Sequence, residues 1–162
     1  EILFKTAGTE RMKIDATGAV TKPLQPAFLV TPSSTQTNIA VGSEVTVVFG
    51  TEIFDQNADN FASNQFTAPV TGKYQLNLTL YINEIDTASD YYHIKIVTSN
   101  RNYSSVIDPG VFAGDPVYWN IPIAALADMD AGDTAKVTVK QNNGTAQTDI
   151  INETTFSGYL VA

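Results

Sequence analysis

The sequence predicts an all-β protein whose main part is an antiparallel jelly-roll β-sandwich, preceded by a short β-hairpin. Three observations support this fold class. About nine short segments alternate apolar and polar side chains, which is the pattern of a strand with one buried face. Turn residues separate these segments at intervals of roughly 8 to 15 residues. No long segment has the period of an amphipathic helix.

Length and composition favour one domain with a short appendage. The 162 residues suffice for a sizeable core, and the absence of cysteine excludes a disulfide framework, a thiolate metal site and a cysteine nucleophile. The 9 basic and 17 acidic residues give a net charge of −8, so we expect no nucleic acid partner. No apolar run approaches the roughly 20 residues of a spanning helix, so we expect no membrane insertion. Because the chain begins at Glu1, we expect a fragment or a processed product.

The first predicted element is a hairpin formed by residues 2–6 and 10–14, with Gly8 in its turn. A two-stranded hairpin is at best marginally stable in water. We therefore expect it to pack on the main domain or on copies of itself in other chains. Its apolar face consists of Ile2, Phe4, Met12 and Ile14.

A linker and three strands are expected next. Residues 21–26 contain two prolines, which favour an extended and stiff connection. We therefore expect a stem hairpin with its linker in residues 1–25 and a jelly-roll head in residues 26–162. In the head, residues 27–30 form a short strand, and the alternation through residues 45–53 predicts two more.

The clearest alternation predicts a long central strand that starts near Tyr74. The turn before it contains Pro69, which prevents the run ending at Ala68 from continuing as a central strand. We expect Gly72 to adopt the left-handed conformation in this turn. The apolar face of the strand consists of Tyr74, Leu76, Leu78, Leu80 and Ile82.

The rest of the chain is predicted to be mostly strands. Pro122 indicates that its strand lies at a sheet edge or contains a bulge. Residues 124–130 are the one helical candidate, and they are too short to change the fold class. Alternation predicts five further strands at residues 91–97, 103–107, 117–123, 135–139 and 155–161.

Four stretches of the predicted head follow the pattern of a known family. The most specific is FTAPVTGKY at residues 66–74, and the last is TFSGYL at residues 155–160. Pro26-Ala27-Phe28 and Gly132-Asp133 support them. In order and spacing, these stretches resemble the globular domain of the complement C1q/tumour necrosis factor superfamily. The resemblance covers residues 26–162 and implies a jelly roll that assembles as a homotrimer.

One segment departs from the family pattern. The family has a tyrosine and a Gly-Lys turn before the Thr-Ala-Pro motif, whereas residues 61–65 are shorter here. Asn64 can supply the left-handed turn instead. The departure concerns the geometry of a loop rather than the fold.

The first 20 residues resemble a different group of proteins. TERMKID at residues 9–15, followed by Gly18-Ala19-Val20, is similar to a pattern of bacteriophage tail fibres and other virion appendage proteins. The two resemblances together imply the extracellular tip of a trimeric virion fibre. Such a tip would attach to a host cell-surface glycan or protein receptor by multivalent adhesion. The alternative is a secreted C1q-like module that binds protein or carbohydrate.

The sequence predicts no enzymatic activity. The only histidine, His93, alternates with apolar residues in a predicted strand and shares a face with Tyr91 and Lys95. We interpret it as a packing residue rather than a general base. The chain contains no G-x-S-x-G motif, phosphate-binding glycine loop or histidine pair for a metal. A carbohydrate-active enzyme would need paired carboxylates in a cleft, which nothing in the sequence places.

Calcium is the one cofactor that the sequence raises. The segment DQNADN at residues 55–60 begins as a calcium loop does, with oxygen ligands at alternate positions. However, Asn60 replaces the glycine and Phe66 replaces the glutamate of such a loop, which favours a solvated turn. Some relatives of the resembled family bind calcium, so a site built from loop acids is kept as a hypothesis. Its candidate ligands are Asp55, Asp59, Asp90 and Asp108.

Aromatic residues suggest two surfaces and part of the core. Tyr92 and Trp119 are assigned to the core by alternation. Exposed tyrosines near polar residues suit receptor recognition, because they offer flat apolar area at low entropic cost. The candidate receptor contacts are Tyr91, Arg101, Tyr103 and Tyr118. The candidate trimer contacts are Tyr74, Tyr81, Phe156 and Tyr159, with core burial as the alternative for Phe156.

Overall fold

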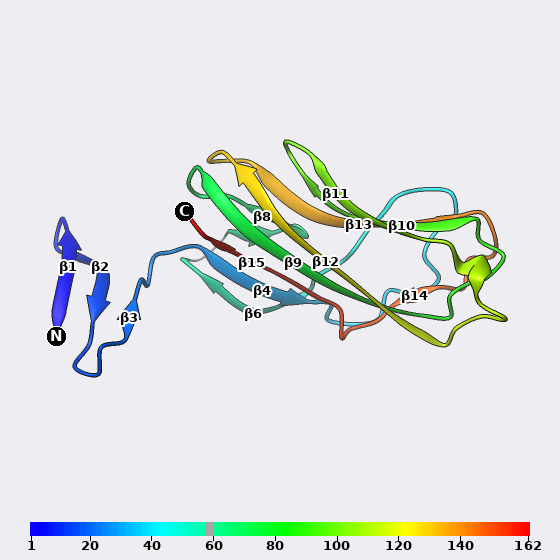
Figure 1. Cartoon of the computed structure of the whole chain (residues 1–162), viewed down its shortest axis with the longest axis horizontal. Coiled ribbons are helices and arrows are strands. Elements are labelled where there is room, and N and C mark those ends of the chain that lie inside the picture. Colours follow the sequence, from blue (N-terminus) through cyan, green and yellow to red (C-terminus); the bar gives the residue numbers. More distant parts are fainter. Residues whose placement is uncertain (58–59) are drawn as a thin grey trace.

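The structure, a computed structural model, describes residues 1–57 and 60–162. Two six-stranded antiparallel sheets face each other as a sandwich, and a three-stranded sheet precedes them. Figure 1 shows this small sheet at one end of the molecule, joined to the sandwich by a single extended segment. The predicted all-β jelly-roll class is confirmed. No helix in the described residues is long and apolar enough to cross a membrane.

The N-terminal sheet has the order β1-β2-β3, and β1 and β2 form the predicted hairpin. Ile2 lies opposite Ile14, and Phe4 lies opposite Met12, so the four predicted apolar residues share a face. A third strand, which the alternation did not predict, pairs with β2. The strands are β1 (Ile2–Thr6), β2 (Thr9–Ile14) and β3 (Val20–Thr21).

The first sheet of the sandwich has the order β12-β9-β15-β4-β6, and β14 also pairs with β9. We call it the β9 sheet, after the strand that pairs with three others. The long strands β9 and β12 are paired along their whole length. The members are β4 (Ala27–Thr31), β6 (Thr51–Gln56), β9 (Gly72–Asn83), β12 (Tyr118–Met129), β14 (Asp149–Ile150) and β15 (Thr155–Leu160).

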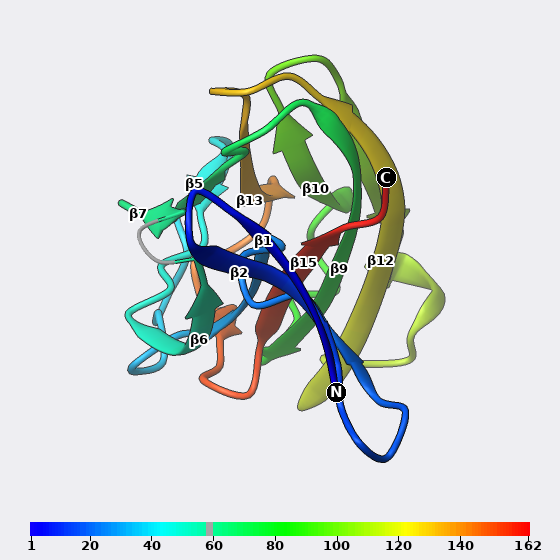
Figure 2. The same ribbon diagram turned by 90° about the vertical axis from the view of Figure 1, so that its left-hand side faces the viewer.

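The second sheet has the order β11-β10-β13-β8-β7, and β5 also pairs with β13. We call it the β13 sheet. Figure 2 shows it facing the β9 sheet across the sandwich. A short 3₁₀ helix, η1 (Pro109–Val111), follows β11. The members are β5 (Val45–Thr46), β7 (Phe61–Ala62), β8 (Gln65–Thr67), β10 (Tyr91–Thr98), β11 (Asn102–Ile107) and β13 (Thr134–Asn142).

The core lies between these sheets and follows the predicted alternation. All five predicted apolar residues of β9 are at most 1% exposed, and Tyr92, Ile94 and Ile96 of β10 are fully buried. Phenylalanines fill one part of the core, where the rings of Phe28 and Phe66 stack with centroids 4.6 Å apart. Phe66, from the FTAPVTGKY motif, therefore serves packing.

The helical candidate at residues 124–130 is wrong, because β12 continues as a strand to Met129. Ile121, Ile123, Ala125 and Ala127 alternate with exposed residues along it. Local propensity for helix is overridden there by pairing with β9. β12 is an edge strand, so the prediction for Pro122 is confirmed: an edge position tolerates a residue without an N–H group.

The prediction that Gly72 is left-handed is also wrong, since its φ is not positive. Gly72 instead begins β9 where the C-terminal segment passes close by. A Cβ there would lie 2.6 Å from both the carbonyl oxygen of Ala162 and Cδ1 of Leu160. The glycine therefore permits a close approach rather than a turn. The left-handed conformation expected for Asn64 is confirmed, with φ 64° between β7 and β8.

Three loops gather at the end of the sandwich farthest from the N-terminal sheet (Figure 1). They are the segments 84–90, 108–117 and 143–148. Asp115 connects them, since its carboxylate accepts hydrogen bonds from the Thr87 backbone N–H and from Gln147 Nε2, each at 2.9 Å. We call this end the distal end.

Candidate functional site

The outward face of the β9 sheet is polar at its centre and aromatic near the distal end. Alternation along β9 turns Gln75, Asn77, Thr79, Tyr81 and Asn83 outward, and all five are half-buried. The Oδ1 atom of Asn83 is buried and has no hydrogen-bond partner among the described residues. A buried acceptor without a donor costs free energy. The row of half-buried polar side chains makes this face suited to a partner surface.

A shallow hollow of about 300 Å³ lies on this face, lined by Tyr81, Tyr118, Trp119 and Asn120. The rings of Tyr81 and Tyr118 have centroids 6.0 Å apart. Trp119 was expected in the core, but 41% of it is exposed. Trp119 lies at the start of the edge strand β12. The ring of Phe112, from the loop between β11 and β12, packs against it with ring centroids 4.8 Å apart. Alternation predicts on which side of its sheet a residue lies. It does not predict whether the opposite sheet extends far enough to bury that residue.

Two of the four predicted trimer contacts are contradicted by burial. Tyr74 and Phe156 are fully buried in the core of a single chain, so neither can contact another protomer directly. The Tyr74 hydroxyl donates to the carbonyl of Val70 at 2.8 Å, and burial raises the pKa of this phenol. Tyr81 and Tyr159 do face outward from the β9 sheet, and Tyr159 is 49% exposed.

The four candidate receptor contacts do not gather into one site. Tyr103 packs against the core from β11, and Arg101 forms an ion pair with Asp128 at 2.8 Å. Tyr118 belongs to the hollow on the β9 sheet, while Tyr91 lies on the outward face of the β13 sheet. Arg101 and Tyr118 are exposed, Tyr91 and Tyr103 are half-buried, and Tyr91 and Tyr118 lie on different sheets.

His93 lies on the outward face of β10, as predicted, among charged side chains. Burial and the Lys95 ammonium hold the pKa of His93 below its ordinary value of 6.5. Lys140 acts in the same direction, and the Glu44 carboxylate opposes them. Lys140, which no sequence motif marks, lies on this face through the alternation along β13.

The candidate calcium ligands lie in separate local structures. The Asp55 carboxylate accepts hydrogen bonds from the backbone N–H groups of Asn60 and Phe61, at 2.8 and 2.9 Å. Asp90 accepts from the side chain of Asn142, and Asp108 caps η1. Asp59 lies outside the described residues. Among the described residues, no three His, Cys, Asp or Glu side chains are arranged to hold a metal ion, so calcium remains a prediction.

A buried polar network supports the distal loops. The backbone N–H of Asp86 donates to the Tyr92 hydroxyl at 2.9 Å, and this hydroxyl lies 2.6 Å from Oγ1 of Thr148. The Asp86 carboxylate accepts from the backbone N–H groups of Ala88 and Thr145. Burial raises the pKa of Tyr92, whose predicted core position is confirmed. This network is structural and holds two loops against β10.

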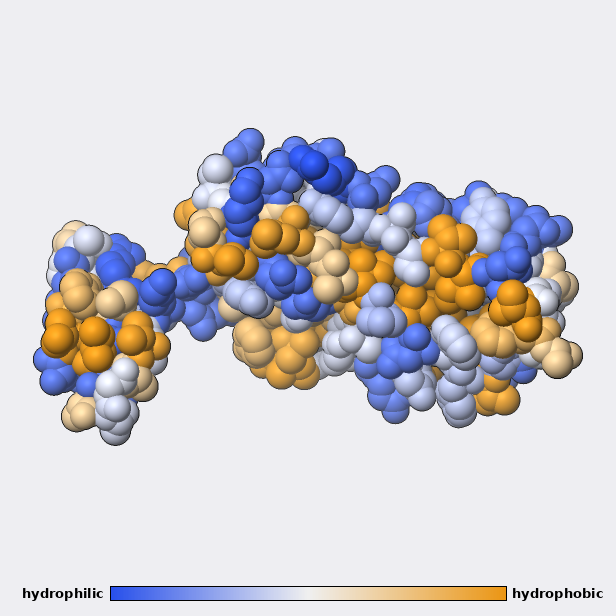
Figure 3. Space-filling model, viewed as in Figure 1, coloured by the Kyte–Doolittle hydropathy of each residue, from blue (hydrophilic) through white to orange (hydrophobic). Residues whose placement is uncertain are grey.

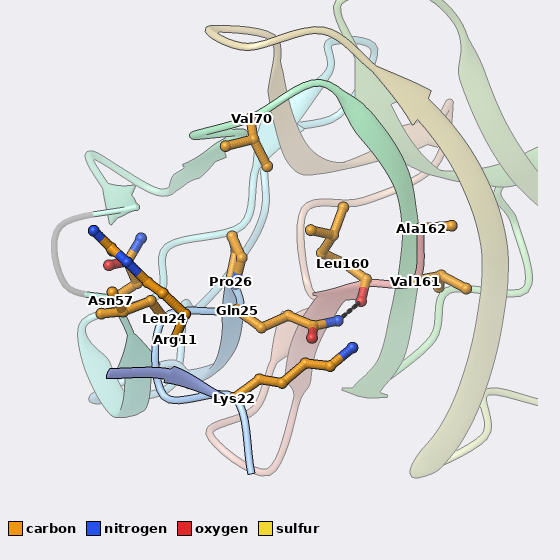
Figure 4. A pocket seen from close by; sticks show the side chains of 10 residues that line it. All are labelled: Arg11, Lys22, Leu24, Gln25, Pro26, Asn57, Val70, Leu160, Val161 and Ala162. Atoms are coloured by element: carbon orange, nitrogen blue, oxygen red, sulfur yellow. Dashed lines mark hydrogen bonds between the residues drawn. The ribbon is translucent and has the colours of Figure 1, made fainter. Parts of the chain in front are cut away.

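The opposite end of the sandwich has a hollow of about 430 Å³ beside the linker (Figure 4). Its lining combines apolar residues with the basic side chains of Arg11 and Lys22. Figure 4 shows Gln25 reaching across to the backbone of Leu160, to which its Nε2 donates at 2.6 Å. This contact fixes the linker to the last strand. The hollow lies where the linker meets the sandwich.

Comparisons with known proteins identify the fold. No protein-family model and no curated protein matches the chain. The globular domain of zebrafish complement 1qA protein superposes with a TM-score of 0.62 at 19% identity, covering 85% of this chain and 98% of that chain. Murine APRIL at pH 8.0 gives 0.61 at 12% identity, covering 85% and 99%. The sandwich is therefore a jelly roll like those of complement C1q and APRIL, as the sequence motifs predicted.

Proposed function

We propose that the chain is the tip of a homotrimeric virion fibre, such as a bacteriophage tail fibre, and attaches to a receptor on a host cell. One observation carries the proposal: a small sheet with exposed apolar side chains on β1 and β3 precedes a head with a C1q-like fold. In this reading residues 1–25 are the stem and linker and residues 26–162 are the head.

The N-terminal sheet lacks the burial that would make it stable alone. Ile2 is 55% exposed, Phe4 48% and Val20 55%. Figure 3 shows hydrophobic side chains spread across the surface of this small body. A sheet of so few residues needs a partner to cover its apolar side chains. Two further copies of the same sheet, related by a threefold axis, would cover them equally in every protomer.

The outward face of the β9 sheet offers the second contact between protomers. Its central residues are half-buried and polar, and its margins carry Tyr81, Tyr118 and Tyr159. Aromatic residues with hydroxyl groups are common in protein interfaces, because they combine apolar area with a hydrogen-bonding end.

The distal end would then point away from the fibre. Its loops are held by buried hydrogen bonds to Tyr92 and Asp86, so they keep their shape without a ligand. Three identical heads on one axis would bind a cell surface with avidity even if each site is weak. Such a protein needs no catalytic group.

Light scattering during size-exclusion chromatography tests the assembly. At micromolar concentration, the full chain should have three times its mass of 17.5 kDa. A monomer or a dimer under these conditions would overturn the proposed trimer. Attachment is measured separately, as retention of labelled protein on whole cells.

A second candidate function is a secreted C1q-like module that binds protein or carbohydrate. The observation in its favour is the likeness of the sandwich to the zebrafish complement 1qA domain and to murine APRIL. This candidate requires no role for the exposed N-terminal sheet. If deletion of residues 1–20 leaves the trimer intact, the secreted module is favoured over the fibre tip.

A further inference from the structure

Positive charge gathers on the outward face of the β13 sheet, although the chain as a whole carries a net charge of −8. Alternation along β10 turns Tyr91, His93 and Lys95 outward, and alternation along β13 does the same for Lys136 and Lys140. We call these five residues the basic strip. The distance from Lys136 to Lys140 along β13 is about 13 Å, from a rise of roughly 3.3 Å per residue.

Strand pairing places the residues of the basic strip next to one another. His93 lies directly opposite Lys140, and Lys95 lies opposite Thr138. Val97, the next outward residue of β10, lies opposite Lys136. Directly paired side chains on one face of a sheet have their Cβ atoms about 5 Å apart. The strip is therefore continuous across two neighbouring strands.

Only part of this charge is neutralised within the chain. Glu44 forms an ion pair with Lys95 and also accepts a hydrogen bond from Thr138 at 3.4 Å. Within residues 1–57 and 60–162, Lys136 and Lys140 have no acidic partner within 4.0 Å. The neighbouring strand β11 presents Ser104 and Val106 to the same face, and neither is acidic.

His93 is the residue directly opposite Lys140. A protonated imidazole there would oppose a like charge, which is destabilising across paired strands. Burial, Lys95 and Lys140 all disfavour this proton and lower the pKa of His93, so the positive charge of the strip is carried by its lysines.

Tyr91 adds a flat apolar surface at one end of the strip. The ammonium group of Lys140 lies 5.9 Å from the centre of its ring. Asn142, directly opposite Tyr91, donates its side-chain N–H to the Asp90 carboxylate at 2.9 Å and keeps its Oδ1 atom as an acceptor. An aromatic ring beside a cation and an amide suits a sugar ring that carries a carboxylate.

We propose that the basic strip binds a polysaccharide bearing carboxylate groups, with Lys136 and Lys140 as the main contacts to its charge. The inference deepens the proposed attachment function by naming the class of receptor, and it rests on that function for its biological role. The ligand runs along the strands, so that successive carboxylates meet successive lysines. The acidic remainder of the chain disfavours nucleic acid, whose phosphates are much more densely charged.

The test measures binding of the purified full chain to polysialic acid and to polygalacturonic acid by calorimetry, with neutral dextran and single-stranded DNA for comparison. We expect binding to one or both acidic polysaccharides and none to dextran. Preference for one of them identifies the source of the carboxylate as a sialic or a uronic acid. Binding should weaken as salt rises from 50 to 200 mM, because it depends on ion pairing.

Two charge-matched double variants separate the strip from net charge. Lys136→Gln/Lys140→Gln should weaken binding by about tenfold or more, whereas Lys22→Gln/Lys73→Gln should change it by less than about twofold. Equal losses in both variants, tighter binding to DNA or dextran, or no binding to either acidic polysaccharide would overturn the inference. Light scattering on the same samples keeps the two proposals apart. A trimer that binds no polysaccharide refutes only the strip, and a monomer that binds selectively refutes only the trimer.

Discussion

Gly158 of β15 lies directly opposite Phe28 of β4, and a Cβ at Gly158 would stand 2.8 Å from Cε1 of the Phe28 ring. The same Cβ would lie 2.7 Å from Cδ2 of Leu76. The glycine of the Phe-Ser-Gly motif therefore leaves room for an aromatic ring in the core. This contact joins the last strand of the sandwich to its first.

Gly158→Ala should lower the free energy of unfolding by about 1–3 kcal/mol, because an extra methyl group overpacks this part of the core. Urea denaturation measures the change. Gly114→Ala is the control, since Gly114 has no atom within 4 Å of the added Cβ and no positive φ. Its stability should stay within about 0.5 kcal/mol of the parent. Equal stability of the two variants would contradict the packing role.

Phe4→Ser should weaken the proposed trimer, since Phe4 is 48% exposed in the single chain and would be covered by other copies. Losing a large aromatic contact in each protomer should raise the dissociation concentration by at least about tenfold. Light scattering over a dilution series measures it. The control is Lys5→Ser, on the neighbouring position of the same strand. A trimer unaffected by Phe4→Ser would show that the N-terminal sheet does not hold the protomers together.

Thr148→Val should lower the free energy of unfolding by about 1–3 kcal/mol, because it leaves a buried tyrosine hydroxyl with one partner fewer. The Thr148 Oγ1 atom lies 2.6 Å from the Tyr92 hydroxyl and donates to the carbonyl of Glu84 at 3.1 Å. Thr145→Val is the matched control, because the described hydrogen bonds of Thr145 use its backbone. Chemical denaturation should separate the two variants. Equal destabilisation would refute a specific role for the Thr148 hydroxyl.

Stability should fall on acidification in two windows. The pKa of His93 in the folded chain is below 6.5, so under that pH the unfolded chain takes up a proton that the folded chain resists. The free energy of unfolding therefore decreases as the pH falls from about 6.5. The Lys95 ammonium holds the pKa of Glu44 below its ordinary 4.5. The stability from that ion pair is present above 4.5 and is lost as the pH falls through the folded value.

His93→Gln should abolish the loss of unfolding free energy that begins near pH 6.5. The loss at lower pH, which comes from Glu44, should remain. Urea denaturation at pH 7.5 and pH 5.5 measures this, with the parent losing more stability between the two values than the variant. His93 faces Lys95 on its own strand, Lys140 on β13, Glu44 before β5 and the apolar Val106 on β11. If parent and variant lose equal stability, the histidine is not the titrating group.

Local alternation was sufficient to predict the central strand, its buried face and the pairing of the N-terminal hairpin. The five inward residues of β9 were identified correctly because the side-chain period of a strand is set by the backbone alone. Alternation could not show where a sheet ends. Trp119 was assigned to the core for that reason, although it lies at a margin that the opposite sheet does not cover.

Errors arose where contacts between distant residues override local preference. Residues 124–129 combine alanine and leucine, which favour helices, yet twelve residues of β12 pair with β9. Position 72 needs a glycine because a Cβ there would collide with the backbone of Ala162, the last residue of the chain. The basic strip was missed because Lys140 and His93 become neighbours only through the register of β10 and β13.

The amino-acid sequence by itself determined the fold class and the apolar side of the central strand, since these follow from a period of two residues and from turn residues. Only the tertiary structure decided which strands are neighbours. Pairing over long separations buried Tyr74 and Phe156, left the N-terminal sheet uncovered and set Lys140 opposite His93. Surfaces for assembly and binding arise from such neighbours, because a surface is formed by residues that are distant in the chain.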